Sequence, residues 1–233
     1  MNDKATKIYI KTSDENHETI FSGIKFNDFI ECTPTPVKNI LLLKSGYFGE
    51  KRKYNFELLE GQGDVKKLMS ENIYHYGDFC FVDYSNPDSV REQTREQIAE
   101  LLYLAHMNEP LKSPFWETLQ NNFAYLSHDD GWYCKLYCRN QQDSASILIN
   151  KLQNVIQKAL CENTFFLPND LIEKTKEVSK RGLLVKLDTS VQREKAAVVK
   201  LYEVGEYHNI DDLFNSIEQE KPPVFFEIKF SNN

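Results

Sequence analysis

The sequence predicts an α+β fold: a mainly antiparallel or mixed sheet built from hairpins, with two longer amphipathic helices packed on it. Two observations favour this class. Short segments of alternating apolar and polar residues occur in pairs separated by turn residues, which is typical of β-hairpins. Two longer segments carry apolar residues every three or four positions, and the strands do not alternate regularly with helices as in a parallel sheet.

The first hairpins lie near the start of the chain. Ile8 and Ile10 alternate with polar residues, residues 13–18 form a turn, and residues 19–26 are expected to be extended. A second hairpin is predicted from residues 39–44 and 52–59, on either side of a glycine-containing turn at 46–49. The first sixty residues are therefore expected to be mainly β.

The composition then shifts toward helix. Asp64 is placed to cap a short helix over 65–71, and residues 78–84 are expected to form a strand. Asn86 followed by Pro87 predicts a helix start, and an apolar stripe continues from Val90 to Ala105. This is the first of the two longer helices.

The second half of the chain repeats these signals. The expected elements, in order, are a hairpin over 124–138, the second longer helix over 144–161, a helix over 170–181, a strand over 183–187, a strand over 196–204, a helix over 210–218 and a strand over 224–230. Residues 194–204 would also accept a helix because they are rich in alanine, and strand is our prediction for them.

The chain is long enough to bury a sizeable core. Its 233 residues are 41% hydrophobic and 27% charged, which is typical of a chain that folds unaided and not of a disordered one. We predict a single α+β domain over 1–233. The alternative is a β-rich N-terminal subdomain over 1–62, ending at the glycine-containing loop that begins at Gly61.

The net charge and the cysteines indicate which classes of partner are unfavourable and which cellular compartment to expect. The net charge of −7 opposes binding to nucleic acid, whose phosphates require Lys and Arg. The longest apolar run, residues 40–43, is too short to cross a membrane, and residues 1–11 lack the apolar stretch of a signal peptide. Five irregularly spaced cysteines favour reduced thiols. We expect a soluble cytoplasmic protein of undetermined oligomeric state.

The hairpin over 124–138 carries the main chemical candidates. His128, Asp129 and Asp130 at its tip could ligate a divalent metal or position a water molecule. The same residue types are what a tight turn requires, and we favour that interpretation. His75 and Asp78 could form an acid–base pair ahead of the next strand, although nothing local orients one toward the other. These five residues are the weak catalytic candidates.

No metal site or cofactor is predicted. Cys134 and Cys138 lie four residues apart on an expected strand, which separates their Cα atoms by roughly 13 Å, too far for a disulfide or for two ligands of one zinc ion. The loop at Gly61 lacks the further residues of a phosphate-binding loop, and common catalytic signatures are absent from the sequence.

The same hairpin predicts a binding surface. Trp132 shares a strand face with Cys134 and is expected in the core, while Tyr133, Lys135 and Tyr137 share the opposite face. Aromatic rings beside a lysine suit a protein partner or a flat ligand.

Our functional prediction is a non-catalytic, soluble cytoplasmic protein that binds a protein partner. Its acidic charge and the lack of catalytic signatures favour this class, whereas enzymatic activity is left open. The alternatives are a metal-assisted hydrolase that uses His128, Asp129 and Asp130, and a small-ligand sensor.

Overall fold

A computed structural model describes residues 6–15, 17–48, 51–71, 79–94, 114–128, 133–189, 196–207 and 210–231. The chain forms two compact units, neither of which is continuous in sequence. The first unit comprises Met1–Asp14, Thr19–Pro34 and Gln142–Asn233, and the second comprises Glu15–Glu18 and Thr35–Gln141. That the chain acts as one domain stays a prediction.

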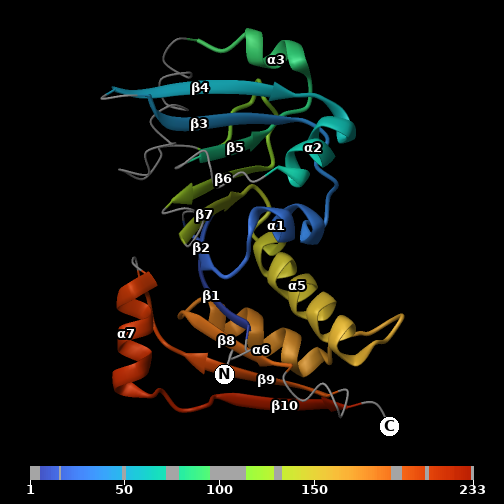
Figure 1. Ribbon diagram of the computed structural model, residues 1–233, viewed down its shortest axis with the longest axis vertical. Coiled ribbons are helices and arrows are strands. Elements are labelled where there is room, and N and C mark those ends of the chain that lie inside the picture. The colour runs from blue at the N-terminus through green and yellow to red at the C-terminus, as the bar shows by residue number, and fades with distance from the viewer. Residues whose placement is uncertain are drawn as a thin grey trace. The chain divides into compact units, whose positions relative to one another are not determined.

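The first unit contains a sheet whose described strands run in the order β10-β9-β8-β1-β2 (Figure 1). The ladders of β1 with β8, β8 with β9, and β9 with β10 are antiparallel. The strands are β1 (Thr6–Ser13), β2 (Glu18–Ser22), β8 (Leu183–Asp188), β9 (Ala196–Glu203) and β10 (Phe226–Ser231). The helices are α1 (Phe26–Cys32), α5 (Gln142–Leu160), α6 (Asn169–Ser179) and α7 (Ile210–Glu220).

The helix α5 forms because its apolar residues recur at helical spacing. Leu148, Leu152 and Ile156 are fully buried, and Leu160 extends the same stripe by one turn. Lys151 of α5 forms an ion pair with Asp28 of α1, at 2.5 Å between Nζ and Oδ1. The predicted second long helix is therefore confirmed, and its apolar stripe lies in the core of the first unit.

Two glycines fix the chain reversal between α6 and β8. Gly182 has a φ of +94°, which few other residues adopt, and a β-carbon there would overlap the carbonyl group of Gly205. The same carbonyl accepts a hydrogen bond from Tyr9 Oη at 3.1 Å. This close approach of two backbones positions the start of β8 in the sheet.

The second unit contains a sheet whose described strands run in the order β7-β6-β5-β3-β4, and its four ladders are antiparallel. The strands are β3 (Ile40–Phe48), β4 (Lys51–Leu59), β5 (Phe79–Asp83), β6 (Phe123–His128) and β7 (Tyr133–Cys138). The described helices are α2 (Gly61–Ser70) and α3 (Pro87–Arg91).

One face of this second sheet is closed by residues that precede β6. Trp116 and Leu119 come from the segment 114–122, and both pack in a single buried cluster. The other members lie mainly on the strands: Leu41, Cys80, Val82, Tyr84, Ala124, Leu126 and Tyr137. The segment 114–122 thus acts as a cover over the sheet, and it determines which side chains of β7 reach solvent.

The buried Asn121 holds this cover in place. Its Oδ1 accepts a hydrogen bond from the backbone N–H of Trp116 at 2.8 Å. Its Nδ2 donates to the carbonyl oxygens of Pro114 and Phe123 at 2.8 and 3.2 Å. Because all three partners are backbone groups, one side chain fixes the path of the whole segment.

Asp83 joins the end of β5 to the same segment. Its Oδ1 accepts hydrogen bonds from the backbone N–H groups of Asn122 and Phe123, both at 2.8 Å. Its Oδ2 accepts a third bond from Nδ2 of Asn122 at 3.0 Å. Burial raises the pKa of the Asp83 carboxyl, and the three hydrogen bonds oppose that shift.

The predicted α+β class is confirmed, and so are most of the strands. Residues 196–203 form β9, antiparallel to β8, so the prediction of a strand there is confirmed. Asn86 caps α3 as predicted, with its Oδ1 accepting from the N–H of Asp88 at 3.0 Å.

Several local predictions are wrong. Phe26, predicted to end a strand, begins the helix α1. The helix expected from Asn86 to Ala105 ends at Arg91, and residues 92–94 are not helical. The helix α2 begins at Gly61, so Asp64 lies within its first turns and does not cap it.

Candidate functional site

The chemical candidates of the 124–138 hairpin lie at or beyond the edge of the described residues. The pairing of β6 with β7 is as predicted, and it ends with His128 opposite Tyr133. Asp129 and Asp130 lie outside the described residues, as do His75 and Asp78. Within the described part of the chain, no group of three His, Cys, Asp or Glu side chains could hold a metal ion.

The strand register pairs described residues that are next in sequence to the two groups of catalytic candidates. Phe79, the residue after Asp78, pairs with Ser127, the residue before His128. The described strand ends next to both groups therefore lie side by side at one end of the second unit's sheet. This proximity could not be predicted from sequence, because it depends on the pairing of β5 with β6.

Tyr137, which belongs to the predicted binding surface of the hairpin, is not exposed to solvent. This side chain is only 4% exposed, because Trp116 and Leu119 of the cover pack in the same cluster. Tyr137 Oη donates a hydrogen bond to Oε2 of Glu18 at 2.9 Å. Lys135 Nζ lies 3.8 Å from the same oxygen. The expected exposure of Tyr137 is therefore wrong, and both residues are engaged by Glu18 within the second unit.

The buried cysteines are not poised for chemistry. Cys134 and Cys138 both lie on β7, as the strand prediction requires, and both are buried thiols outside any disulfide. Burial raises the pKa of Cys134 to about 11, against smaller opposing effects of its hydrogen bonds with Tyr125 and Ser127. A thiol with such a pKa is protonated at neutral pH and is a poor nucleophile.

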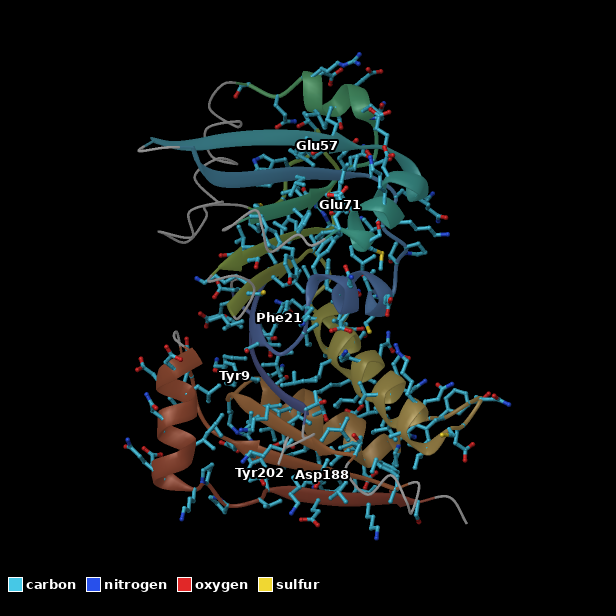
Figure 2. All side chains as sticks on the ribbon, in the orientation of Figure 1. Tyr9, Phe21, Glu57, Glu71, Asp188 and Tyr202 are labelled. Carbon is cyan, nitrogen blue, oxygen red and sulfur yellow. The ribbon has the colours of Figure 1, made fainter. Side chains whose placement is uncertain are left out.

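A small pocket in the second unit lies beside α2. Its volume is about 100 Å³, well below the 300–1,000 Å³ of typical small-molecule sites. Three of its seven lining residues are acidic, and two of these, Glu57 and Glu71, are marked in Figure 2. The remaining lining residues are Leu58, Leu59, Asp64, Lys67 and Leu68. Asp64 is engaged by the chain itself, accepting from the N–H of Glu60 at 3.0 Å.

A stronger candidate lies in the first unit, along β10. Among the described residues, the exposed large hydrophobic side chains are Phe166 at 77%, Phe225 at 43% and Val224 at 42%. Two of them immediately precede β10, and the third follows Phe165, whose ring meets that of Phe230 edge-to-face at 5.2 Å. We call these three side chains, together with Phe226, Ile228 and Phe230 of β10, the β10 surface.

Alternation along β10 produces the apolar side of this surface. Phe226, Ile228 and Phe230 are half-buried, while the residues between them are exposed. Their partners on β9 are Leu201, Val199 and Ala197, which are fully buried. The apolar face of the sheet therefore continues from the core onto β10, where the burial of its side chains becomes partial.

Two described side chains contact the aromatic rings on the apolar side of β10. Lys174 of α6 places Nζ 5.3 Å from the ring of Phe225 and 5.1 Å from that of Phe226. Phe165 covers Phe230 at the other end of the strand. β10 is the outermost strand of the unit's described sheet, with β9 on one side (Figure 1). Its outer edge therefore combines backbone hydrogen-bonding groups with apolar side chains.

The polar side of β10 carries charges of both signs. Glu227 lies opposite Lys200 of β9 and forms an ion pair with it, at 3.2 Å between Oε2 and Nζ. Lys229 lies opposite Val198. Asp188 and Tyr202, labelled in Figure 2, lie on the neighbouring strands β8 and β9. Such a surface can pair with a strand, but it does not gather acid–base groups for catalysis.

Sequence reasoning predicted the last strand but not its exposure. Val224, Phe225 and Phe226 form a run of three apolar residues, which departs from strict alternation at the start of β10. That run was the available signal, because a strand with one buried face cannot bury three consecutive side chains.

Comparison with protein-family models, curated proteins and solved structures gave no significant match. None of the described helices has the length and apolar character needed to cross a membrane.

Proposed function

We propose that this chain is a non-catalytic cytoplasmic protein that binds a protein partner, and that the β10 surface is where the partner binds. The observation that carries the proposal is the coincidence of exposed Phe166, Val224 and Phe225 with the outermost strand of the first unit's sheet. Concentrated exposed apolar side chains favour association, because burial of each aromatic ring removes some 150–250 Å² from water.

The backbone of β10 supports the same conclusion. An outermost strand presents alternate N–H and C=O groups outward, and an added strand from a partner can bond to them. Backbone bonds provide the alignment, while pockets and rings beside the strand provide selectivity. Phe225 precedes the strand, and Phe166 follows Phe165, whose ring contacts Phe230 near the other end, so exposed apolar residues occur in the segments next to both ends.

The reduced state expected of the cytoplasm is compatible with the thiols of the chain. Four cysteines are buried and form no disulfide, and burial raises the pKa of one of them, Cys32, to about 11; the others are Cys80, Cys134 and Cys138. Thiols of this kind behave as small apolar residues of the core. They favour a binding protein over a thiol-dependent enzyme.

The proposal can be tested by cross-linking in the cells of origin. A photoreactive phenylalanine analogue replaces Phe166, and in a control variant it replaces Asp212, an exposed residue of α7. Irradiation should join position 166 to one defined polypeptide, which mass spectrometry of the adduct identifies. Position 212 should give no such adduct. Equal labelling from both positions, or none from position 166, would contradict the proposal.

A further inference from the structure

We propose that the partner is a second copy of this chain, and that two β10 strands pair antiparallel about a two-fold axis through Ile228. The inference rests on the proposed function, since it uses the same β10 surface, and it adds the identity of the partner. It follows from the charge pattern of β10, the positions of its exposed rings and the geometry of antiparallel pairing.

The sequence of β10 is complementary to itself when it is reversed. Residues 226–230 read Phe, Glu, Ile, Lys, Phe. In an antiparallel pair centred on Ile228, Glu227 lies opposite Lys229 of the partner subunit, and Lys229 lies opposite the partner's Glu227. Both charge pairs are then attractive, and cross-strand neighbours of opposite charge stabilise a sheet.

The apolar side is complementary in the same register. Phe226 lies opposite the partner's Phe230, and Ile228 lies opposite the partner's Ile228. Aromatic and β-branched residues form favourable cross-strand pairs. These three side chains are half-buried in the single chain, so pairing removes the remaining exposed area from water. A shift of the register by one residue would place Ile228 opposite Lys229 or Glu227 of the partner subunit.

The two-fold axis also exchanges the ends of the β10 surface. Phe166 follows Phe165, which contacts Phe230 at one end of the strand. Val224 and Phe225 precede the other end. Since the axis passes through Ile228, the end of β10 at Phe230 in one copy lies beside the end at Phe226 in the other. The end of β10 next to Phe165 in one copy is thereby brought to the end that follows Phe225 of the partner subunit.

The neighbouring strand β9 strengthens the charge argument. Glu227 already pairs with Lys200 on its inner side, and the partner's Lys229 would flank it on the outer side. Lys229, which lies opposite Val198 of β9, would have the partner's Glu227 on its outer side. The polar face of the combined sheet would thus carry alternating charges across the junction.

Exchange of single charges provides the main experiment. The wild-type chain is expected to sediment at twice its mass of 27.3 kDa at about 100 μM protein. Glu227→Lys places Lys opposite Lys at both ends of the junction, and Lys229→Glu places Glu opposite Glu. Each variant alone should have a dissociation constant roughly tenfold to hundredfold higher.

A mixture of the two variants provides the decisive control. When Glu227→Lys and Lys229→Glu chains pair with each other, every charge again faces an opposite charge. The mixture should therefore form a heterodimer with an affinity near that of the wild type. Thermal unfolding of each variant checks that the fold is retained. Glu227→Lys also breaks the ion pair with Lys200, so its thermal unfolding is compared directly with that of Lys229→Glu.

A cysteine at the axis tests the register independently. In a Cys161→Ser background, which removes the exposed native thiol, Ile228→Cys should form a disulfide between two copies because position 228 faces itself. Glu227→Cys is the matched control, since its two copies would lie diagonally, about 7–8 Å apart. Faster oxidation at 227 than at 228 would overturn the proposed register.

The outcomes separate this inference from the proposed function. A wild-type chain that stays monomeric at about 100 μM, or a mixture of variants that does not associate, would overturn the dimer. If position 166 then cross-links to a different polypeptide, the proposed function stands and only the identity of the partner is wrong. If position 166 cross-links to no polypeptide, both proposals fail. Cross-linking to the same chain, with rescue in the mixture, supports both.

Discussion

The strands β7 and β10 differ in how far their aromatic side chains are exposed. Both strands are six residues long and both carry aromatic rings. Tyr137 of β7 is 4% exposed, whereas Phe225 beside β10 is 43% exposed. The difference teaches that alternation defines the two faces of a strand, but the exposure of each face depends on which distant segment packs against it.

The two strands differ in their cover. In the second unit, the segment 114–122 brings Trp116 and Leu119 into the cluster that buries Tyr137. In the first unit, described contacts to the apolar side of β10 come from Phe165 and Lys174. A lysine over an aromatic ring shields it from water less completely than a packed apolar side chain, because its ammonium group stays hydrated.

Substitution of Asn121, which holds the segment 114–122 in place, should have the largest effect on the free energy of unfolding. Asn121→Ala is expected to lower the free energy of unfolding by about 3–5 kcal/mol, because three buried backbone groups lose their partner. Urea denaturation followed by circular dichroism measures the change. Asn163→Ala is the control: Asn163 is exposed, and its backbone carbonyl accepts the bond from Gln157. Equal losses in the two variants would show that Asn121 does not hold the segment.

Substitution of Asp83 should have an intermediate effect. Asp83→Ala removes three hydrogen bonds to Asn122 and Phe123 and is expected to cost about 2–3 kcal/mol in urea denaturation. Asp83→Asn keeps an oxygen that can accept from both backbone N–H groups, so its cost should be about 1 kcal/mol or less. A larger loss with Asn than with Ala would contradict this role of the carboxylate oxygen.

The pH dependence of Asp83 has a defined sign. Its pKa is raised in the folded protein above the ordinary value of 3.8, so the native state binds the proton more tightly than the unfolded chain. The stability of the wild type relative to Asp83→Asn should therefore rise as the pH falls through the folded pKa, and level off below 3.8. A relative stability that falls over the same range would mean that the hydrogen bonds outweigh burial.

The β10 surface should give the smallest effect on folding. Phe166→Ala is expected to change the free energy of unfolding of dilute protein by no more than about 0.5 kcal/mol, because the ring is 77% exposed. Its neighbour Leu167 is 5% exposed, and Leu167→Ala should cost about 2–5 kcal/mol. Chemical denaturation of both variants measures the contrast. A loss of about 2 kcal/mol or more for Phe166→Ala would show that this ring packs within its own chain.

The regular elements could be predicted because their signals are local. Alternation of Ile8 and Ile10 in β1, the stripe through Leu148 and Leu152 in α5, and the cap at Asn86 depend only on neighbouring residues. The fold class follows from such signals, since it requires only the type and order of the elements.

Features that depend on tertiary contacts could not be predicted from the sequence. The stripe from Val90 to Ala105 favours a continuous helix, yet the chain leaves the helical conformation after Arg91. The exposure of Tyr137 was wrongly predicted because Trp116 is positioned by hydrogen bonds of Asn121, which no spacing in the sequence reveals. The β10 surface was missed for the converse reason: the apolar run Val224 to Phe226 indicates excess apolar surface, but it does not show that the segments packed against β10 cover it only in part.

An open strand edge is also a hazard in a crowded cell, since like edges can add to one another without limit and precipitate. Among the described strands, β10 has such an edge, and exposed apolar residues precede it. Pairing through a two-fold axis at Ile228 would consume both β10 edges in one step, so that growth from this side of the sheet stops at two copies. The placement of Glu227 and Lys229 on either side of the axis would then protect against aggregation, because strands added in other registers would bring like charges together or leave them unpaired.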